Sequence, residues 1–512
     1  MTKTKRIQIL CLLGAVTLLL SGCWTEAPVE SANGLLGDQE PADQQEEVIL
    51  PAAFTLPYDP DQTLDPVTCA DGMQQVAGSL IYEGLFRLDR QLEPQPWLCQ
   101  SYTYDAASLT YTFTLRSGVT FSDGSPLTAA DAAATLRRAK SSQRYSARLA
   151  HVAAVSAGDG VVIVTLSRPD SSLPALLDIP IVKSGTEESL TPVGTGPYYF
   201  TTDEAGACLA SHSGWWRGES RPAERIALSA ARDREAILYQ FSSHEVQLIT
   251  ADLIGTEPIT ATGNISYEDA DTTVLQFLGF NTARAPFQDS AARRALGLGI
   301  NRETLVSAVL SGHARAAQFP VSPVSPLYPA ELESLYSYDD FAAAMEAAGL
   351  NTGWTRTVTL LVNQENTFKV SAAEHIAQAL SDFDLQIQVE ALPWEEYAAA
   401  LAAGNFDLYY GEVRLPANWD LSALVGTGGS LNYGGWADPQ TEQLLAACAA
   451  AEDRAAALSD LCAYLQQQAP ILPLCFKSSS VLYQTGAVSG LTPTAAEPFY
   501  DLPSCQIHLR QP

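Results

Sequence analysis

The stretch 358-VTLLVNQENTFKVSAAEHIAQALSDFDLQIQVEALPWEEYAAALAAGNFDLYYGEV-413 decides the fold class, because its hydrophobic pattern alternates between two periods. Three runs of apolar residues predict strands, and they cover 358–362, 385–391 and 406–413. Two Ala-rich segments predict helices, and they cover 368–381 and 394–403, the second ending at Gly404. Strands that alternate with helices of this length indicate a parallel α/β sheet.

Ligands bind beyond the carboxyl ends of the strands in such sheets. Three segments follow predicted strands here: Asn363 to Asn366, Pro393 to Glu395, and the residues from Glu412 onward. The last of these, 407-DLYYGEVRLPANWDLSAL-424, places acidic, basic and aromatic residues directly after an apolar run. The sequence therefore predicts a binding edge at this end of the sheet.

Outside this stretch, local signals predict further elements. Alternating Tyr111, Phe113 and Leu115, followed by Arg116-Ser117-Gly118, predict a hairpin over 102–121, and VVIVTL at 161–166 predicts a strand. Thr128, with Asp131 three residues later, predicts a capped helix that reaches about Lys140. Asp289 or Ser290 opens a second predicted helix through Leu298.

The N-terminus has the pattern of a secretory signal. Lys3, Lys5 and Arg6 precede an apolar run from Ile7 to Leu20, which is too short to span a membrane. The run ends in Leu20-Ser21-Gly22-Cys23, which looks like a bacterial lipobox. We expect residues 1–22 to be removed and Cys23 to carry lipid; the alternative is an ordinary cleavage site beside a chance cysteine.

Residues 23–47 predict a flexible acidic tether, since positions 24–47 hold seven acidic residues and no basic one. About 465 residues follow, enough for two or three domains. The formal net charge of −29 argues against nucleic acid and anionic lipid headgroups as partners. This charge could attract cationic solutes, or it could serve solubility alone.

The residue inventory points away from catalysis. The six histidines form no HExxH motif or close pair, so we expect no metal, and no Gly-x-Ser-x-Gly elbow or cofactor motif occurs. Apart from Cys11 and Cys23, seven cysteines remain, and their odd number leaves any disulfide pairing open. The absence of a catalytic arrangement favours a binding protein that needs no cofactor.

Five segments, in order along the chain, resemble the family 5 extracellular solute-binding proteins of ABC importers, which include oligopeptide, dipeptide and nickel binders. They are 80-LIYEGLFRLD-89, 111-YTFTLRSGVTFSDGSPLTAAD-131, 193-VGTGPYYF-200, 278-LGFNTARAPFQDSAARRALGLGINRETL-305 and 470-PILPLCFK-477. The resemblance runs from about residue 48 to the end. Their order and spacing, more than any one motif, carry it.

The resemblance implies an α/β, two-lobe periplasmic-binding-protein-like fold (type II, cluster C) with an extra α/β domain inserted in lobe I. By analogy, lobe I takes 48–80, 188–275 and 481–512. The extra domain takes 81–187, and lobe II takes 276–480. The parallel sheet predicted at 358–413 falls inside lobe II, which agrees with this division.

The resemblance also implies a function without enzyme activity. A monomeric receptor, anchored by lipid to the extracytoplasmic face of a bacterial cell membrane, would close its lobes on a peptide or other small polar solute and deliver it to ABC permease subunits. Two alternatives use the same anchor: a ligand-binding sensor for a signalling partner, and an extracellular hydrolase. The hydrolase would require a nucleophile or an acid pair in the cleft.

The candidate ligand-binding residues lie mainly at the predicted sheet edge. They are Gly72, Phe368, Trp394, Tyr410, Gly411, Glu412, Val413, Arg414 and Asp420. In the peptide-binding relatives, a tryptophan at the position of Trp394 lines the pocket; the alternative is that Trp394 only packs at the start of a helix.

The segment after the last strand departs from the family pattern. Many peptide binders place an aspartate there for the peptide's α-amino group, but this chain has Arg414-Leu415-Pro416. A buried ammonium without a counter-charge is costly, so ordinary recognition of a peptide N-terminus is in doubt. We expect Glu412 and Arg414, which face the same side of an extended chain, to be the polar anchors. Alternatively, both charges pair with neighbours in the protein, and Asp420 caps a helix near Leu421.

Overall fold

The computed structural model describes residues 50–510 except 70–71, 260–262 and 382. The predicted signal at 1–22, the lipidation site Cys23 and the tether at 23–47 lie outside this part of the chain. No helix in the described ranges is long and apolar enough to cross a membrane. These ranges also contain no disulfide bond.

The elements predicted for 358–413 are confirmed. They are β16 (Arg356–Asn363), α7 (Thr367–Ala379), β17 (Leu385–Leu392), α8 (Trp394–Ala403) and β18 (Leu408–Arg414). Gly404 ends α8 with a left-handed φ of 67°, a conformation that costs glycine little. β16 lies between β17 and β18 and is parallel to both.

The sheet is larger than these strands and is mixed. Its order is β13-β19-β14-β18-β16-β17, with β15 also paired to β19. The added strands are β13 (Leu248–Ala251), β14 (Ile265–Phe280), β15 (Ala314–Ala316) and β19 (Ile471–Gln484). β14 is antiparallel to both β18 and β19. The predicted parallel arrangement therefore holds for β16, β17 and β18. The other strands of this sheet run antiparallel to the neighbours with which they pair.

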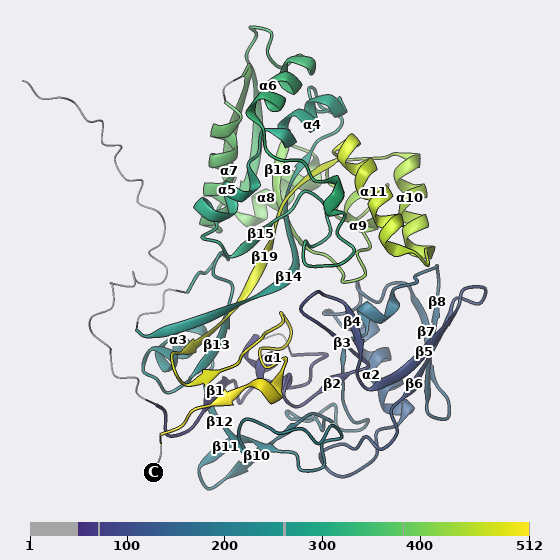
Figure 1. Ribbon diagram of the computed structural model, residues 1–512, viewed down its shortest axis with the longest axis vertical. Helices are drawn as coiled ribbons and strands as arrows, with labels where there is room; N and C mark the ends of the chain where they lie inside the picture. The colour runs from purple at the N-terminus through teal and green to yellow at the C-terminus, as the bar shows by residue number, and fades with distance from the viewer. Residues whose placement is uncertain (1–49, 70–71, 260–262, 382, 511–512) are drawn as a thin grey trace, which may run out of the picture. The chain divides into compact units, whose positions relative to one another are not determined.

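Helices cover both faces of this sheet, so successive side chains of a strand enter different cores. Tyr410 belongs to the core under α4 (Ser290–Leu298), α6 (Tyr338–Ala347) and α7. Tyr409 belongs to the core under α8, α10 (Pro439–Ala450) and α11 (Arg454–Gln468). Figure 1 shows α7 and α10 on opposite sides of the strands. Burial on both faces explains the nearly continuous apolar runs in the sequence.

A second sheet has four strands in the order β1-β12-β11-β10. They are β1 (Thr55–Tyr58), β10 (Tyr198–Asp203), β11 (Gly206–Ser211) and β12 (Arg225–Ala230), accompanied by α1 (Gly72–Gly78) and α3 (Arg234–Ser242). Its core joins residues distant in sequence, including Leu56, Ile226 and Val481. These segments must fold together to bury their apolar side chains.

A third sheet, ordered β5-β6-β8-β7, is antiparallel throughout and packs against α2 (Ala129–Ser141). Its strands are β5 (Cys99–Asp105), β6 (Thr110–Leu115), β7 (Val152–Ala157) and β8 (Val161–Leu166). Thr128 and Asp131 form the predicted capping box. The predicted hairpin over 102–121 is wrong in its second half: β6 pairs with the preceding β5, and 119–121 form no strand.

Short elements complete the fold. They are the strand pairs β2 (Glu83–Gly84) with β9 (Pro180–Ile181), β3 (Phe86–Leu88) with β4 (Pro94–Pro96) and β20 (Val488–Ser489) with β21 (Gln506–Ile507), and the helices α5 (Arg302–Thr304) and α9 (Ser422–Val425). The helix predicted from Asp289 or Ser290 is α4, capped by Asp289.

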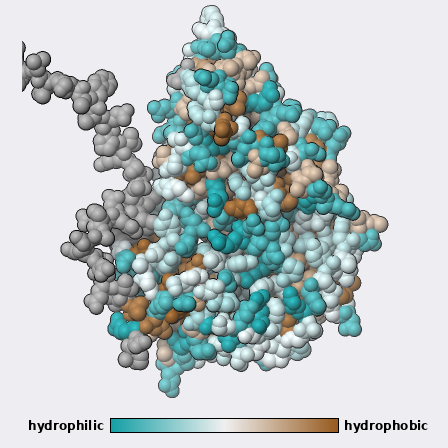
Figure 2. Space-filling model, viewed as in Figure 1, coloured by the Kyte–Doolittle hydropathy of each residue, from teal (hydrophilic) through white to brown (hydrophobic). Residues whose placement is uncertain are grey.

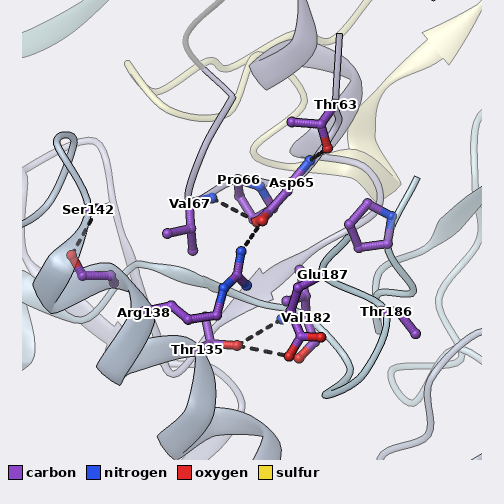
Figure 3. A network of polar contacts seen from close by, with 12 residues as sticks. Thr63, Asp65, Pro66, Val67, Thr135, Arg138, Ser142, Val182, Thr186 and Glu187 are labelled. Carbon is purple, nitrogen blue, oxygen red and sulfur yellow. Dashed lines mark hydrogen bonds and ion pairs between the residues drawn. The ribbon is translucent and has the colours of Figure 1, made fainter. Parts of the chain in front are cut away.

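Two buried carboxylates tie the third sheet's region to the second. The Glu83 carboxylate accepts hydrogen bonds from the indole nitrogens of Trp97, Trp215 and Trp216 and from the Thr195 hydroxyl. Figure 3 shows the other network, in which Asp65 accepts from the Val67 backbone at 3.0 Å and forms an ion pair with Arg138 of α2. Buried carboxylates need such donors to remain stable.

Candidate functional site

The carboxyl ends of β16 and β17 meet, as the sequence predicts. Glu365, just after β16, accepts a hydrogen bond from the Asn363 amide at 2.6 Å and another from the Trp394 backbone nitrogen at 3.1 Å. The Trp394 side chain is 61% exposed, and its ring centroid lies 5.9 Å from that of Tyr397. An exposed indole at this edge is available to a solute.

Glu412, near the end of β18, lies among cations. Its carboxylate is 3.3 Å from the ammonium groups of Lys369 on α7 and Lys477 on β19. It also accepts a hydrogen bond from the Gln276 amide at 2.9 Å, and a quarter of the side chain is exposed (24%). Burial alone would raise the pKa of this carboxyl, but the two lysines and the Gln276 amide outweigh burial and lower it.

Lys477 connects Glu412 to a distant part of the chain. Its side chain is only 5% exposed, and its ammonium forms a second ion pair with Asp252, which follows β13. The Asn366 amide, at the start of α7, donates a hydrogen bond to the backbone oxygen of Ile254 at 3.0 Å. The segment after β13, the middle of β19, the end of β18 and the start of α7 thus form one polar network.

Arg414 lies two residues beyond Glu412 on the same strand, opposite Val274 of β14. It is exposed, and no hydrogen bond or ion pair of its guanidinium occurs within the described part of the chain. Burial by surrounding protein nevertheless lowers its pKa, while Glu412 and Asp252 act in the opposite direction. A side chain that is both accessible and surrounded in this way is well placed to meet a solute.

Three candidate residues are occupied by packing. The Tyr410 side chain is 1% exposed, and its hydroxyl donates to the Gln276 side-chain oxygen at 2.7 Å. Phe368 is 9% exposed and belongs to the core that α7 covers. A Cβ at Gly411 would lie 2.5 Å from the Phe277 ring, so this glycine permits a close approach of β14 and β18.

The remaining candidates lie in different surroundings. Val413, half-buried opposite Leu275, packs against the core under α8. Gly72 begins α1 at an exposed position with open space where a Cβ would be.

Asp420 has partners within the protein. It accepts hydrogen bonds from the Ser422 nitrogen and hydroxyl at 2.9 and 2.5 Å, and it forms an ion pair with Arg168. The N-cap residue of α9 is Leu421 rather than Asp420. The structure therefore places Trp394, Glu412 and Arg414 at the carboxyl ends of parallel strands in one sheet, with β16 between β17 and β18, and gives Asp420 partners of its own.

Sequence reasoning missed Lys369, Lys477 and Asp252. One available signal was rarity, because the chain contains only six lysines and two of them meet at Glu412. Lys477 also ends an apolar run, 471-ILPLCF-476, and a lysine is seldom buried without a partner. Neither signal names the partner, since the three residues are far apart in sequence.

A separate cavity of about 530 Å³ lies away from these residues. It is lined mainly by apolar side chains near α4, α11 and β15, and Arg302, Gln318 and Leu335 are among the lining residues. The Arg302 guanidinium donates to the backbone oxygens of Gly297 and Pro473. None of the sequence candidates lines this cavity.

Hydrophilic side chains gather across the middle of the face shown in Figure 2, where the paired strands β14 and β19 run in Figure 1. The family model for bacterial extracellular solute-binding proteins, family 5, matches residues 93–432, more than half of the chain. The chain belongs to this family. It is the substrate-binding receptor of an ABC importer, an extracytoplasmic protein and not an enzyme, so the hydrolase alternative is wrong.

Individual comparisons agree with this assignment. The chain is 28% identical over 357 residues to a glutathione-binding protein of Escherichia coli, which covers 66% of this chain and 69% of that protein. Among solved structures, it resembles a nickel ABC transporter protein from Bacillus halodurans, with a TM-score of 0.72, 21% identity, and coverage of 87% and 98%. It also resembles the oligopeptide-binding protein AppA from Bacillus subtilis, solved with a nonapeptide, with a TM-score of 0.60, 18% identity, and coverage of 90% and 100%. The similarity to these structures shows that this chain has the expected two-lobe α/β fold.

We predict that Glu412→Gln lowers the free energy of unfolding by about 3 kcal/mol at pH 7, because it leaves two partly buried lysines with one acidic partner fewer. Since folding lowers the pKa of this carboxyl, its ionised form stabilises the fold above the unfolded pKa, about 4.3, and that contribution disappears as pH falls through the folded value. Urea unfolding of the wild type and the variant should therefore converge in acid.

The matched control is Glu204→Gln, at an exposed turn position, which should unfold like the wild type at every pH. A stability difference between Glu412→Gln and the wild type that stays constant from pH 7 down to about pH 3 would show that the ionised carboxylate does not stabilise the fold.

Proposed function

We propose that this receptor captures a small polar or peptide-like solute between its two lobes, with the end of β18 and Trp394 as the selecting edge. The single observation that carries the proposal is the accessible Arg414 guanidinium and the exposed Trp394 indole at the carboxyl ends of strands in a family 5 protein. An aromatic wall beside a charged group suits a molecule with an apolar body and a polar end.

The lobes in this proposal are those expected from the resemblance: 48–80, 188–275 and 481–512 for lobe I, 81–187 for the extra domain, and 276–480 for lobe II. Support comes from an irregularity in the long β14–β19 pair. Asp271 lies opposite Ser478, but Leu275 lies opposite Phe476, so β14 has extra residues at this point. We propose that this bulge, next to the 275/276 division, is the hinge.

The attachment of the receptor is part of the same proposal. Cys23 would carry lipid after removal of residues 1–22, and residues 23–47 would connect this anchor to the folded part at the outer face of the cell membrane. Several acyl chains hold a protein firmly, whereas one chain gives marginal attachment. The anchored monomer would then meet its permease in the same membrane.

The relatives indicate which solutes to test first. Their names describe a glutathione-binding protein, an oligopeptide-binding protein and a nickel ABC transporter. We propose peptides and peptide-like acids as the first group, because the edge offers an indole and a guanidinium, and nickel chelates as the second.

We predict that a bound solute reduces the radius of gyration measured by small-angle scattering, because the lobes close. Trp394→Ala should weaken binding of the solute found by thermal-shift screening by roughly tenfold, the value of one aromatic contact. The melting temperature of the free protein should hardly change, since the indole is 61% exposed.

The matched control is Trp354→Ala, because Trp354 is 84% exposed but precedes β16, at the opposite end of that strand. It should bind the solute like the wild type. Loss of the fold in Trp394→Ala, or equal weakening in both variants, would show that Trp394 is no wall of the binding site.

For the anchor, we predict that Cys23→Ser abolishes incorporation of labelled fatty acid and either releases the protein into the medium or leaves the signal uncleaved. Fractionation of cells, with the mass of the N-terminus measured, checks this outcome. A variant that remains in the membrane after its signal has been removed would place the anchor elsewhere.

A further inference from the structure

A small cavity lies where the loop after β8 meets the chain beyond β18. Its volume is about 20 Å³, which is room for one water-sized or monatomic species. The loop contributes residues 168–170 to its walls, the chain beyond β18 contributes residues 418–421, and α10 and α11 contribute the rest. Of the residues proposed from the sequence to meet the solute, only Asp420 lines this cavity.

Direct contacts hold the two sides of the cavity together. The Ser171 backbone nitrogen donates to the Ala449 oxygen at 2.9 Å, and the Ser171 hydroxyl donates to the Ala451 oxygen at 2.7 Å. Arg168 forms an ion pair with Asp420 across the same junction. The walls of the cavity therefore belong to segments that are distant in sequence but fixed against one another.

Three residues that line the cavity carry buried donors that the protein leaves unused. The Nε atoms of Arg168 and Arg454 and the indole Nε1 of Trp419 have no hydrogen-bond partner among the described residues. Trp419 as a whole is only 2% exposed. Buried N–H groups without an acceptor are rare in folded proteins, because they lose their hydrogen bonds to water without replacement. Three such groups around one small space indicate that the space holds an acceptor.

The side-chain acceptors around the cavity are, in contrast, already in use. One oxygen of Asp170 accepts from the Ser172 nitrogen at 2.8 Å, and the other accepts from the Asn418 amide at 2.9 Å. Both oxygens of Asp420 are likewise engaged by protein donors. No buried side-chain oxygen of the lining residues lacks a partner within the described ranges. The unmet need is for an acceptor alone, which an anion supplies without adding donors as water does.

The charges that line the cavity do not oppose a small anion. Arg168 and Arg454 supply two positive charges, and the carboxylates of Asp170 and Asp420 supply two negative ones. An anion there meets no net negative charge, and its hydrogen bonds with two guanidinium groups are of the stronger, charge-assisted kind.

The backbone holds Trp419 in a conformation that is uncommon for this residue type. Its φ is 54°, in the left-handed region, and its backbone nitrogen donates to the Pro416 oxygen at 2.9 Å. Side chains other than glycine adopt this region at a cost, and such strain persists where the surrounding structure requires it, often at ligand sites. The strained residue here is the one whose buried indole nitrogen lacks an acceptor.

We propose that this cavity binds one monatomic anion of the chloride class, held by the N–H groups of Arg168, Trp419 and Arg454. The donors come from the loop after β8, the chain beyond β18 and the first residue of α11, so the ion joins distant segments of the receptor. Anions of several heavy atoms, such as sulfate or gluconate, are too large for a space of about 20 Å³. This site is separate from the proposed solute edge at Trp394.

Crystals of the wild-type receptor grown in sodium bromide test the site directly, because bromide replaces chloride and is located by its anomalous scattering. We expect a bromide signal in this cavity, within hydrogen-bond reach of the three nitrogens. An ordered water at that place, with no bromide signal, would overturn the proposal. This experiment needs no substitution, so it decides the question even if a variant fails to fold.

Calorimetric melting of the receptor measures the same binding in solution. As sodium chloride replaces sodium gluconate at constant ionic strength, the melting temperature should rise along a saturating curve, by about 1–2 °C at tenfold excess over the Kd. A melting temperature that does not respond to this exchange, or that changes without saturating, would contradict the proposal.

Trp419→Phe removes one donor and keeps an aromatic ring in the core. Whatever its own stability, it should raise the half-saturating chloride concentration about tenfold, since it loses one hydrogen bond to an anion. Trp354→Phe is the matched control, because Trp354 is 84% exposed and does not line the cavity; it should respond to chloride like the wild type. Equal half-saturation in Trp419→Phe and the wild type would overturn the assignment of these donors.

Discussion

The buried ammonium of Lys477 sets the constraint on which the binding edge depends. A charge that is 95% covered must have opposite charges beside it, and Lys477 has two, Asp252 and Glu412. These partners come from the segment after β13 and from β18, while Lys477 itself lies in the middle of β19. Satisfying one cation thus fixes the relative positions of three strands and commits Glu412 to the protein rather than to a solute.

The sequence predicts the local structure well where the signal is local. The period changes over 358–413 locate five elements, and Gly404 and Thr128 mark helix ends by their own chemistry. The errors concern which strands pair with one another. Ser117-Gly118 does form a turn, but the chain beyond it does not return along β6, and the β14–β18 pairing depends on residues about 130 positions apart.

The candidate site shows the same division between local and distant information. The strand-end rule places Trp394, Glu412 and Arg414 at one edge, and the geometry agrees with it. It does not reveal that Glu412 faces two lysines while Arg414 faces none of the acids directly. Glu412 and Arg414 look equivalent in the sequence, but in the structure Glu412 is a carboxylate paired within the protein, whereas Arg414 is a cation without an ion pair among the described residues. The family match identifies the protein as a receptor, and we propose that its choice of solute depends on this asymmetry.

A crystal structure of the receptor with an acidic peptide bound would show directly whether Arg414 meets the solute. We expect the peptide carboxylate about 3 Å from the Arg414 guanidinium, with Glu412 still paired to Lys369 and Lys477. It would be contradicted by a peptide ammonium bound to a Glu412 that has left both lysines. A peptide seated in the cavity beside Arg302, with Arg414 in solvent, would contradict it equally.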